Sequence, residues 1–200
     1  SHALHLFPGL AEGLDQNVVS LWKPGWVMGA PFRSVNPVFF DYLEKPEGPE
    51  IVLISLWWEK LFVLLGREEF EEKITETIRS LSSKGKKVIL VADIPSLDSQ
   101  PGACLYLNRI GTEPICGISR ARYEDQRDYL KILQKFESLE NIELIDNFSL
   151  FCDEINCSIL DGNHLLYSDD NHLNERGSIQ FANHIIGQTR FLQPQMRLWD

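Results

Sequence analysis

The chain has 200 residues, 44% of them hydrophobic and 24% charged, which is typical of a globular protein able to bury its own core. Its 29 acidic residues outnumber 19 basic ones, and the formal net charge is −10. Binding to nucleic acid needs clustered Lys and Arg, so we expect no nucleic acid partner. The longest strongly apolar run, 51–58, is far too short to cross a bilayer.

Strand-like and helix-like segments alternate along the chain. Residues 16–46 are rich in Pro, Gly and aromatic residues, and we expect mostly irregular chain there, with a short strand at 18–22. Three apolar runs predict buried strands at 51–56, 87–92 and 142–145, the first interrupted only by Ser55. Helical spacing predicts helices over 67–84, over 119–139 with Ser119 as N-cap, and from Asn174 onward. This alternation predicts an α/β domain with a parallel sheet, whose site lies beyond the carboxyl ends of the strands.

A carboxylate and a histidine stand three residues apart, just before the last predicted helix. Asp169 can reach one ring nitrogen of His172, fix its tautomer and stabilise the imidazolium. Asn174 is the expected N-cap of the helix, which would mount the pair on a rigid turn suited to a general base. A polar surface turn is the plain alternative. A metal site would add His164 and Asp170, but no H-x-x-x-H pair supports one, and we expect none.

The cysteines form two pairs that are close in sequence, Cys104 with Cys116 and Cys152 with Cys157. Neither pair has C-x-x-C spacing, so zinc binding and thioredoxin-like redox chemistry are not favoured. Four cysteines allow three disulfide connectivities, and reduced cysteines of a cytosolic enzyme are the other alternative. The local pairing would close two loops that fall outside the regular segments.

Motifs at the two ends of the chain resemble those of a known superfamily. Ser-His-Ala-Leu-His-Leu-Phe-Pro-Gly-Leu at 1–10 looks like the continuation of a Gly-Asp-Ser-His nucleophile block. Asp-x-x-His-Leu-Asn-x-x-Gly at 169–177 looks like the matching histidine block. The chain thus resembles the SGNH hydrolases, and more closely the SGNH domains fused behind the membrane acyltransferase-3 domain of bacterial surface-polysaccharide O-acyltransferases. Residues 51–57, residues 91–95 and the paired cysteines resemble further blocks in the same order.

This resemblance implies a fold and a catalytic set. The fold would be a three-layer α/β/α, flavodoxin-like domain with a mainly parallel sheet, whose first strand would precede Ser1 and is missing from the chain. Ser1 would be the nucleophile, His172 its base and Asp169 the orienting acid, with Gly29 as an oxyanion donor. Trp57 is a candidate sugar contact. The paired cysteines would form disulfides in an oxidising periplasm. A Ser-His remnant of an expression tag is the alternative origin of Ser1, which the residues that follow disfavour.

The resemblance also implies a function. We expect 1–200 to be a single domain, the C-terminal part of a larger membrane protein, on the periplasmic side of the bacterial inner membrane. It would transfer an O-acyl group, above all O-acetyl, to a sugar hydroxyl of a surface glycan of lipopolysaccharide or peptidoglycan type, without a cofactor. The membrane acyltransferase domain would deliver the acyl donor. A carbohydrate acetylesterase and a non-catalytic glycan-binding domain are the alternatives.

Overall fold

A three-stranded parallel sheet forms the centre of the protein. The computed structural model describes residues 10, 37–98, 100–104 and 116–192. The strands follow the order β1-β2-β4, with bounds Ile51–Ser55, Lys87–Val91 and Ile142–Ile145. In β2, the middle strand, residues Val88 to Val91 are all buried although successive side chains face opposite sides. A strand covered on both faces needs the continuous apolar run that predicted it.

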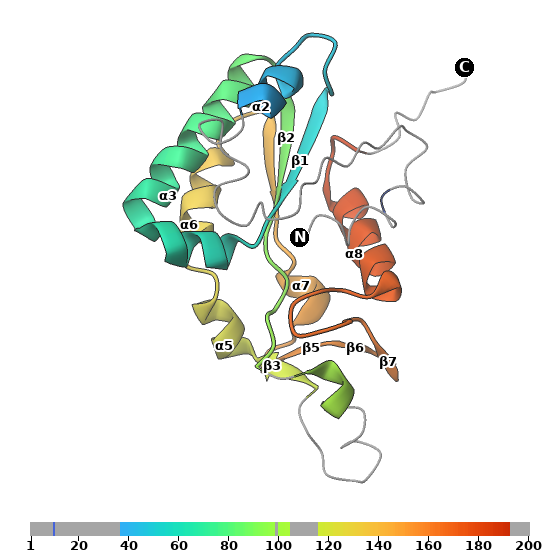
Figure 1. The fold of residues 1–200 in the computed structure, drawn as a ribbon. Coiled ribbons are helices and arrows are strands. Elements are labelled where there is room, and N and C mark those ends of the chain that lie inside the picture. Colours follow the sequence, from blue (N-terminus) through green and yellow to red (C-terminus); the bar gives the residue numbers. More distant parts are fainter. Residues whose placement is uncertain (1–9, 11–36, 99, 105–115, 193–200) are drawn as a thin grey trace, which may run out of the picture.

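Helices cover both faces of this sheet (Figure 1). One face carries α2 (Pro37–Leu43), α3 (Trp58–Ser83), α6 (Leu130–Leu133) and the 3-10 helix η1 (Gln134–Phe136). The other face carries α7 (Phe148–Phe151) and α8 (Glu175–Gln188). Val88 and Leu90 point to the first layer, while Ile89 and Val91 point to the second. The predicted α/β fold with a mainly parallel sheet is therefore confirmed.

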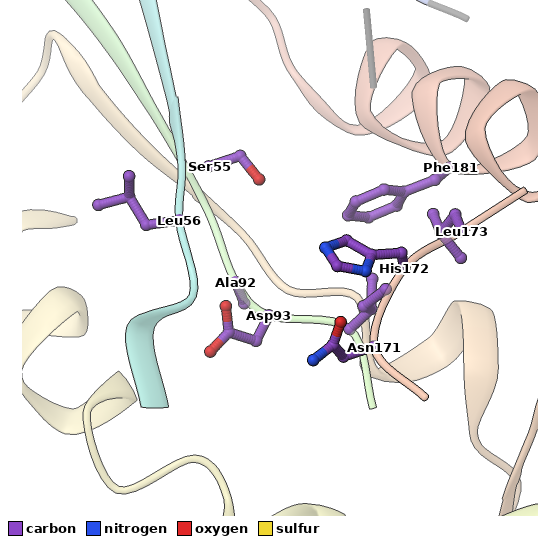
Figure 2. Close-up of a pocket in the computed structure, with 9 residues that line it drawn as sticks. Ser55, Leu56, Ala92, Asp93, Asn171, His172, Leu173 and Phe181 are labelled. Atoms are coloured by element: carbon purple, nitrogen blue, oxygen red, sulfur yellow. The ribbon is translucent and has the colours of Figure 1, made fainter. Parts of the chain in front are cut away.

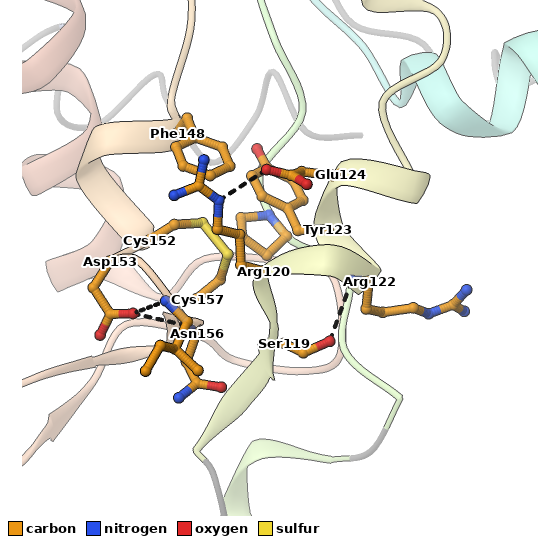
Figure 3. The surroundings of a disulfide bond; sticks show 12 residues. Ser119, Arg120, Arg122, Tyr123, Glu124, Phe148, Cys152, Asp153, Asn156 and Cys157 are labelled. Atoms are coloured by element: carbon orange, nitrogen blue, oxygen red, sulfur yellow. Dashed lines mark hydrogen bonds and ion pairs between the residues drawn. A yellow bond between two sulfur atoms is a disulfide. The ribbon is translucent and has the colours of Figure 1, made fainter.

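Two short antiparallel pairs lie beyond the carboxyl ends of the sheet strands (Figure 1). β3 (Gly117–Ser119) pairs with β5 (Asn156–Ser158), and β6 (Leu160–Asp161) pairs with β7 (His164–Leu165). The disulfides Cys104–Cys116 and Cys152–Cys157 hold this region, so the local pairing is the one that the structure contains. Figure 3 shows the second disulfide beside the stacked rings of Tyr123 and Phe148.

Helix α3 begins nine residues before the predicted start of 67. It is bent at Gly66, whose φ of 75° and ψ of 166° lie outside the helical region. The carboxyl oxygens of Asp93 accept hydrogen bonds from the backbone N–H groups of Trp58, at 3.0 Å, and Glu59, at 2.8 Å. These N–H groups have no partner inside the helix, so the carboxyl group of Asp93 fixes where the helix starts. Because Asp93 follows β2, the periodicity of the helix itself does not reveal this start.

The segment 119–139 forms several short helices, so the prediction of one continuous helix was wrong. Ser119 caps α5 (Arg120–Asp125) as predicted, by accepting a hydrogen bond from the Arg122 N–H at 3.2 Å. The helix then ends, because the Gln126 side chain bonds both the N–H and the carbonyl of Ser96, at 3.1 and 3.0 Å. This long-range contact holds a turn between α5 and α6, where local spacing favoured a helix.

The segment predicted as mostly irregular, 16–46, contains the helix α2 at its end. Residues 11–36, with the predicted strand at 18–22, lie outside the described part of the chain. None of the helices within the described ranges is long and apolar enough to cross a membrane.

Candidate active site

The turn that enters α8 carries Asp169 and His172. The Asn174 side chain accepts a hydrogen bond from the Gly177 N–H at 2.9 Å, which confirms the predicted N-cap. The same amide donates to the carbonyl of Leu165 at 2.7 Å, so it ties the helix to β7. One side chain thus fixes the geometry of the turn from both sides.

Gly177 lets α8 lie directly against the main chain of the preceding segment. A Cβ atom at this position would lie 2.1 Å from the carbonyl oxygen of Leu166, which is closer than any side chain can approach. The glycine of the Asp-x-x-His-Leu-Asn-x-x-Gly motif therefore has a packing role.

Asp169 and His172 form a hydrogen-bonded pair. The Nδ1 atom of His172 lies 2.8 and 3.0 Å from the two carboxylate oxygens of Asp169. Burial opposes the charge on Asp169, but hydrogen bonds from the Asn171 N–H at 3.0 Å, from the His172 ring and from the His172 N–H at 2.8 Å lower its pKa. Asp169 is therefore ionised at neutral pH and holds the proton on Nδ1. Nε2 is then the nitrogen that can accept a proton, as a general base requires.

His172 lines a small cavity, of about 10 Å³, at the carboxyl end of the sheet (Figure 2). The wall comes from segments far apart in the sequence: Ser55 at the end of β1 with Leu56 after it, residues 92–94 after β2, the turn 171–173, and Phe181 of α8. A cavity of this volume holds about one water-sized group. His172 thus lies in a confined site of the kind that parallel sheets form at this edge.

Asp93 lies on the wall of this cavity and is fixed on all sides. Its N–H donates to the hydroxyl of Tyr129 at 2.8 Å, and its carbonyl accepts from the hydroxyl of Tyr123 at 2.5 Å. Burial raises the pKa of its carboxyl to about 8, while the N–H groups of Glu59 and Trp58 oppose the rise. Through these hydrogen bonds Asp93 links the end of β2 to the start of α3 and to two buried tyrosines, and so fixes this part of the cavity wall.

The free energy of unfolding should decrease as pH rises from about 4 to about 8. Across this range the folded protein holds a proton on Asp93 that the unfolded chain, with an ordinary carboxyl pKa near 4, releases. The decrease is at most about 6 kcal/mol, and chemical denaturation at several pH values measures it. Asp93→Asn should remove this slope, because an amide does not titrate, and it should lower stability evenly, because one amide oxygen replaces two acceptors. A variant that keeps the slope would contradict the assignment to Asp93.

Of the other predicted site residues, the structure describes Trp57 but not Ser1 or Gly29. Ser1 and Gly29 lie outside the described residues, so their roles remain predictions. Trp57 occupies the N-cap position of α3 and is half-buried, with Lys60 Nζ 5.7 Å from its ring centroid. Its neighbour Trp58 is a core residue.

Sequence reasoning missed Ser55, Asn171 and Phe181 as parts of the cavity wall. A signal existed for Ser55 alone, since it is the polar residue in an otherwise apolar run. Phe181 occupies the buried face of an amphipathic helix, where a core role and a site role have the same pattern.

Comparison with known proteins identifies relatives of this fold. Residues 1–187 match the family described as the SGNH domain (fused to AT3 domains). Among solved structures, the periplasmic domain of a lipopolysaccharide acetyltransferase from Salmonella ser. Paratyphi A matches with a TM-score of 0.67. This match covers 91% of the present chain and 77% of the other, at 17% sequence identity, and at that identity it shows the fold. No curated protein matches the chain.

Proposed function

Because the chain belongs to the family of SGNH domains fused to AT3 (acyltransferase-3) domains, we propose that it transfers an acyl group to a sugar hydroxyl of a cell-surface glycan. The acyl group is acetyl, and the solved relative suggests a glycan of lipopolysaccharide type. The observation that carries the proposal is the Asp169–His172 pair, since its hydrogen bonds leave Nε2 as the proton acceptor beside a confined cavity.

The proposed reaction has two half-reactions and no cofactor. In the first, the hydroxyl oxygen of Ser1 attacks the acyl carbonyl carbon while His172 Nε2 takes its proton. The histidine returns that proton to the leaving group of the donor, which leaves the acyl group as an ester of Ser1. In the second, a sugar hydroxyl attacks the ester, gives its proton to His172, and Ser1 recovers it on release. Asp169 stabilises the imidazolium in both, and the Gly29 N–H is a proposed donor to the oxyanion.

The proposal includes a place for the domain in a larger protein. The fused AT3 domain delivers the acyl donor, and the SGNH domain faces the periplasm. The two disulfides support this location, since disulfides persist in an oxidising compartment. The half-buried ring of Trp57 is the proposed platform for a sugar ring.

Incubating the purified protein with p-nitrophenyl acetate and a chemically deacetylated lipopolysaccharide glycan tests the proposal. We expect an acetyl ester on the protein and a glycan that gains acetyl mass, both measured by mass spectrometry. The matched reaction without glycan should release p-nitrophenol more slowly, because water is then the only acceptor of the acetyl group. Acetate release with no acetylated glycan would indicate a carbohydrate esterase. Glycan binding without any turnover would indicate a non-catalytic domain.

A further inference from the structure

Ser55 places a hydroxyl in the cavity that also contains His172. It is the last residue of β1, and its backbone pairs with Val91 in the central sheet. Its side chain is 5% exposed and points into the space between the strand and Phe181 (Figure 2). Within the described residues, the Ser55 hydroxyl makes no hydrogen bond. Folded proteins rarely leave the hydroxyl of a buried residue unpaired, so the unpaired Ser55 hydroxyl needs an explanation.

A second polar atom on the same wall is also unpaired. The Oδ1 atom of Asn171 is buried and has no hydrogen-bond partner in the described part of the chain. The remaining wall includes the apolar side chains of Ala92, Leu173 and Phe181. Two unsatisfied polar groups around a space for one small atom or group indicate a binding position for a polar atom of a ligand.

We infer that Ser55 donates its hydroxyl proton to the carbonyl oxygen of the acyl group, an inference that rests on the proposed function. The cavity holds one group of about the size of an oxygen atom, and His172 lies on the same wall, next to where the carbonyl carbon must be. As the carbon becomes tetrahedral, its oxygen gains negative charge, and a fixed donor in a water-poor site stabilises that charge. The amide of Asn171 can supply a second donor after a half-turn of its end group, which exchanges its oxygen for its NH₂.

The position of Ser55 fits a donor and not a second nucleophile. A serine nucleophile must hydrogen-bond to its base, and the structure gives no hydrogen bond between Ser55 and His172. Ser55 is also fixed in β1 of the parallel sheet, where its oxygen keeps a constant position relative to the turn 171–173. A preorganised donor needs this rigidity because it must be in place before charge develops.

Ser55→Ala tests this inference, with Ser178→Ala as a matched control. Ser178 is 2% exposed in α8, so the control removes the same atom from a buried site that does not line the cavity. With p-nitrophenyl acetate as substrate, Ser55→Ala should lower kcat by about 10²- to 10³-fold and change KM by less than about threefold. The unfolding midpoint should not decrease, because the lost hydroxyl has no partner. Ser178→Ala should keep kcat within about twofold of the unaltered protein.

Two results would overturn the inference. The first is a Ser55→Ala variant whose kcat stays within about threefold of the unaltered protein. The second is a loss of kcat that follows a lowered unfolding midpoint, which would assign Ser55 a structural role. If the unaltered protein gave neither turnover nor an acetyl ester, the proposed function itself would fail. That outcome differs from an active protein that is insensitive to Ser55.

Discussion

Replacing His172 with alanine should lower turnover of an acetyl ester by about 10⁴-fold or more, with the protein still folded. Without the imidazole no group on the turn can take the proton of the attacking hydroxyl, and a serine hydroxyl is a weak nucleophile while protonated. His164→Ala is the control, since His164 is an exposed histidine of β7 and does not line the cavity. Steady-state kinetics with p-nitrophenyl acetate measure the loss. Equal activity of both variants would rule out His172 as the base.

Asp169→Asn separates the base from the residue that orients it. The amide oxygen can still accept the N–H groups of Asn171 and His172, so the turn should persist. Its NH₂ group, however, would face Nδ1 and favour the tautomer with the proton on Nε2. We therefore expect a loss of kcat of about the same order, about 10⁴-fold, with little change in KM. A large rise in KM alone would instead indicate that Asp169 contacts substrate.

Replacing Trp58 with alanine should lower the free energy of unfolding by about 4 kcal/mol. Its side chain is 0% exposed, and its Nε1–H donates to the carbonyl of Val91 at 2.7 Å. The ring contacts Phe70 edge-on, with centroids 6.2 Å apart, and lies nearly parallel to Tyr129 at 6.4 Å. Its removal would leave a large cavity between α3 and the sheet, and it would leave the carbonyl oxygen of Val91 without its donor.

The adjacent Trp57 provides a control for that measurement. It is half-buried at the start of α3, so Trp57→Ala should cost less than about 1 kcal/mol. Under the proposed function the same variant should raise KM for the glycan and leave KM for p-nitrophenyl acetate unchanged. Chemical denaturation of both variants measures the two stability changes. If Trp57→Ala were the more destabilising one, the assignment of Trp58 to the core would be wrong.

Patterns within one segment predicted the sheet well. The run at 142–145 matches β4 to the residue, and the runs at 51–56 and 87–92 exceed β1 and β2 by one residue each. Strands buried by the layers around them require continuous apolar residues, and that requirement is visible in the sequence. The helices were less predictable because their ends depend on distant partners. Asp93 sets the start of α3, and Ser96 holds the turn that ends α5.

In the candidate site, too, contacts within one segment were predictable and contacts between distant segments were not. Asp169 and His172 are three residues apart, so a single turn brings them together and their spacing predicts the contact. The cavity, in contrast, is built from four segments that the sheet topology gathers, and no single segment shows that these residues face one common space. Ser55 illustrates this, because only the structure shows which way its side chain points. The roles of Ser1 and Gly29 stay predictions, since both lie outside the described residues.

The close contact between α8 and the carbonyl of Leu166 limits how this motif can vary. Since any side chain at position 177 would collide with main-chain atoms, which cannot rotate away as a neighbouring side chain can, alanine is excluded along with every larger residue. A mutational scan of the helix should thus find this position the least tolerant on its first turn, for a reason of packing alone. A search pattern for related turns should accordingly treat the glycine as obligatory, on a par with the carboxylate and the histidine.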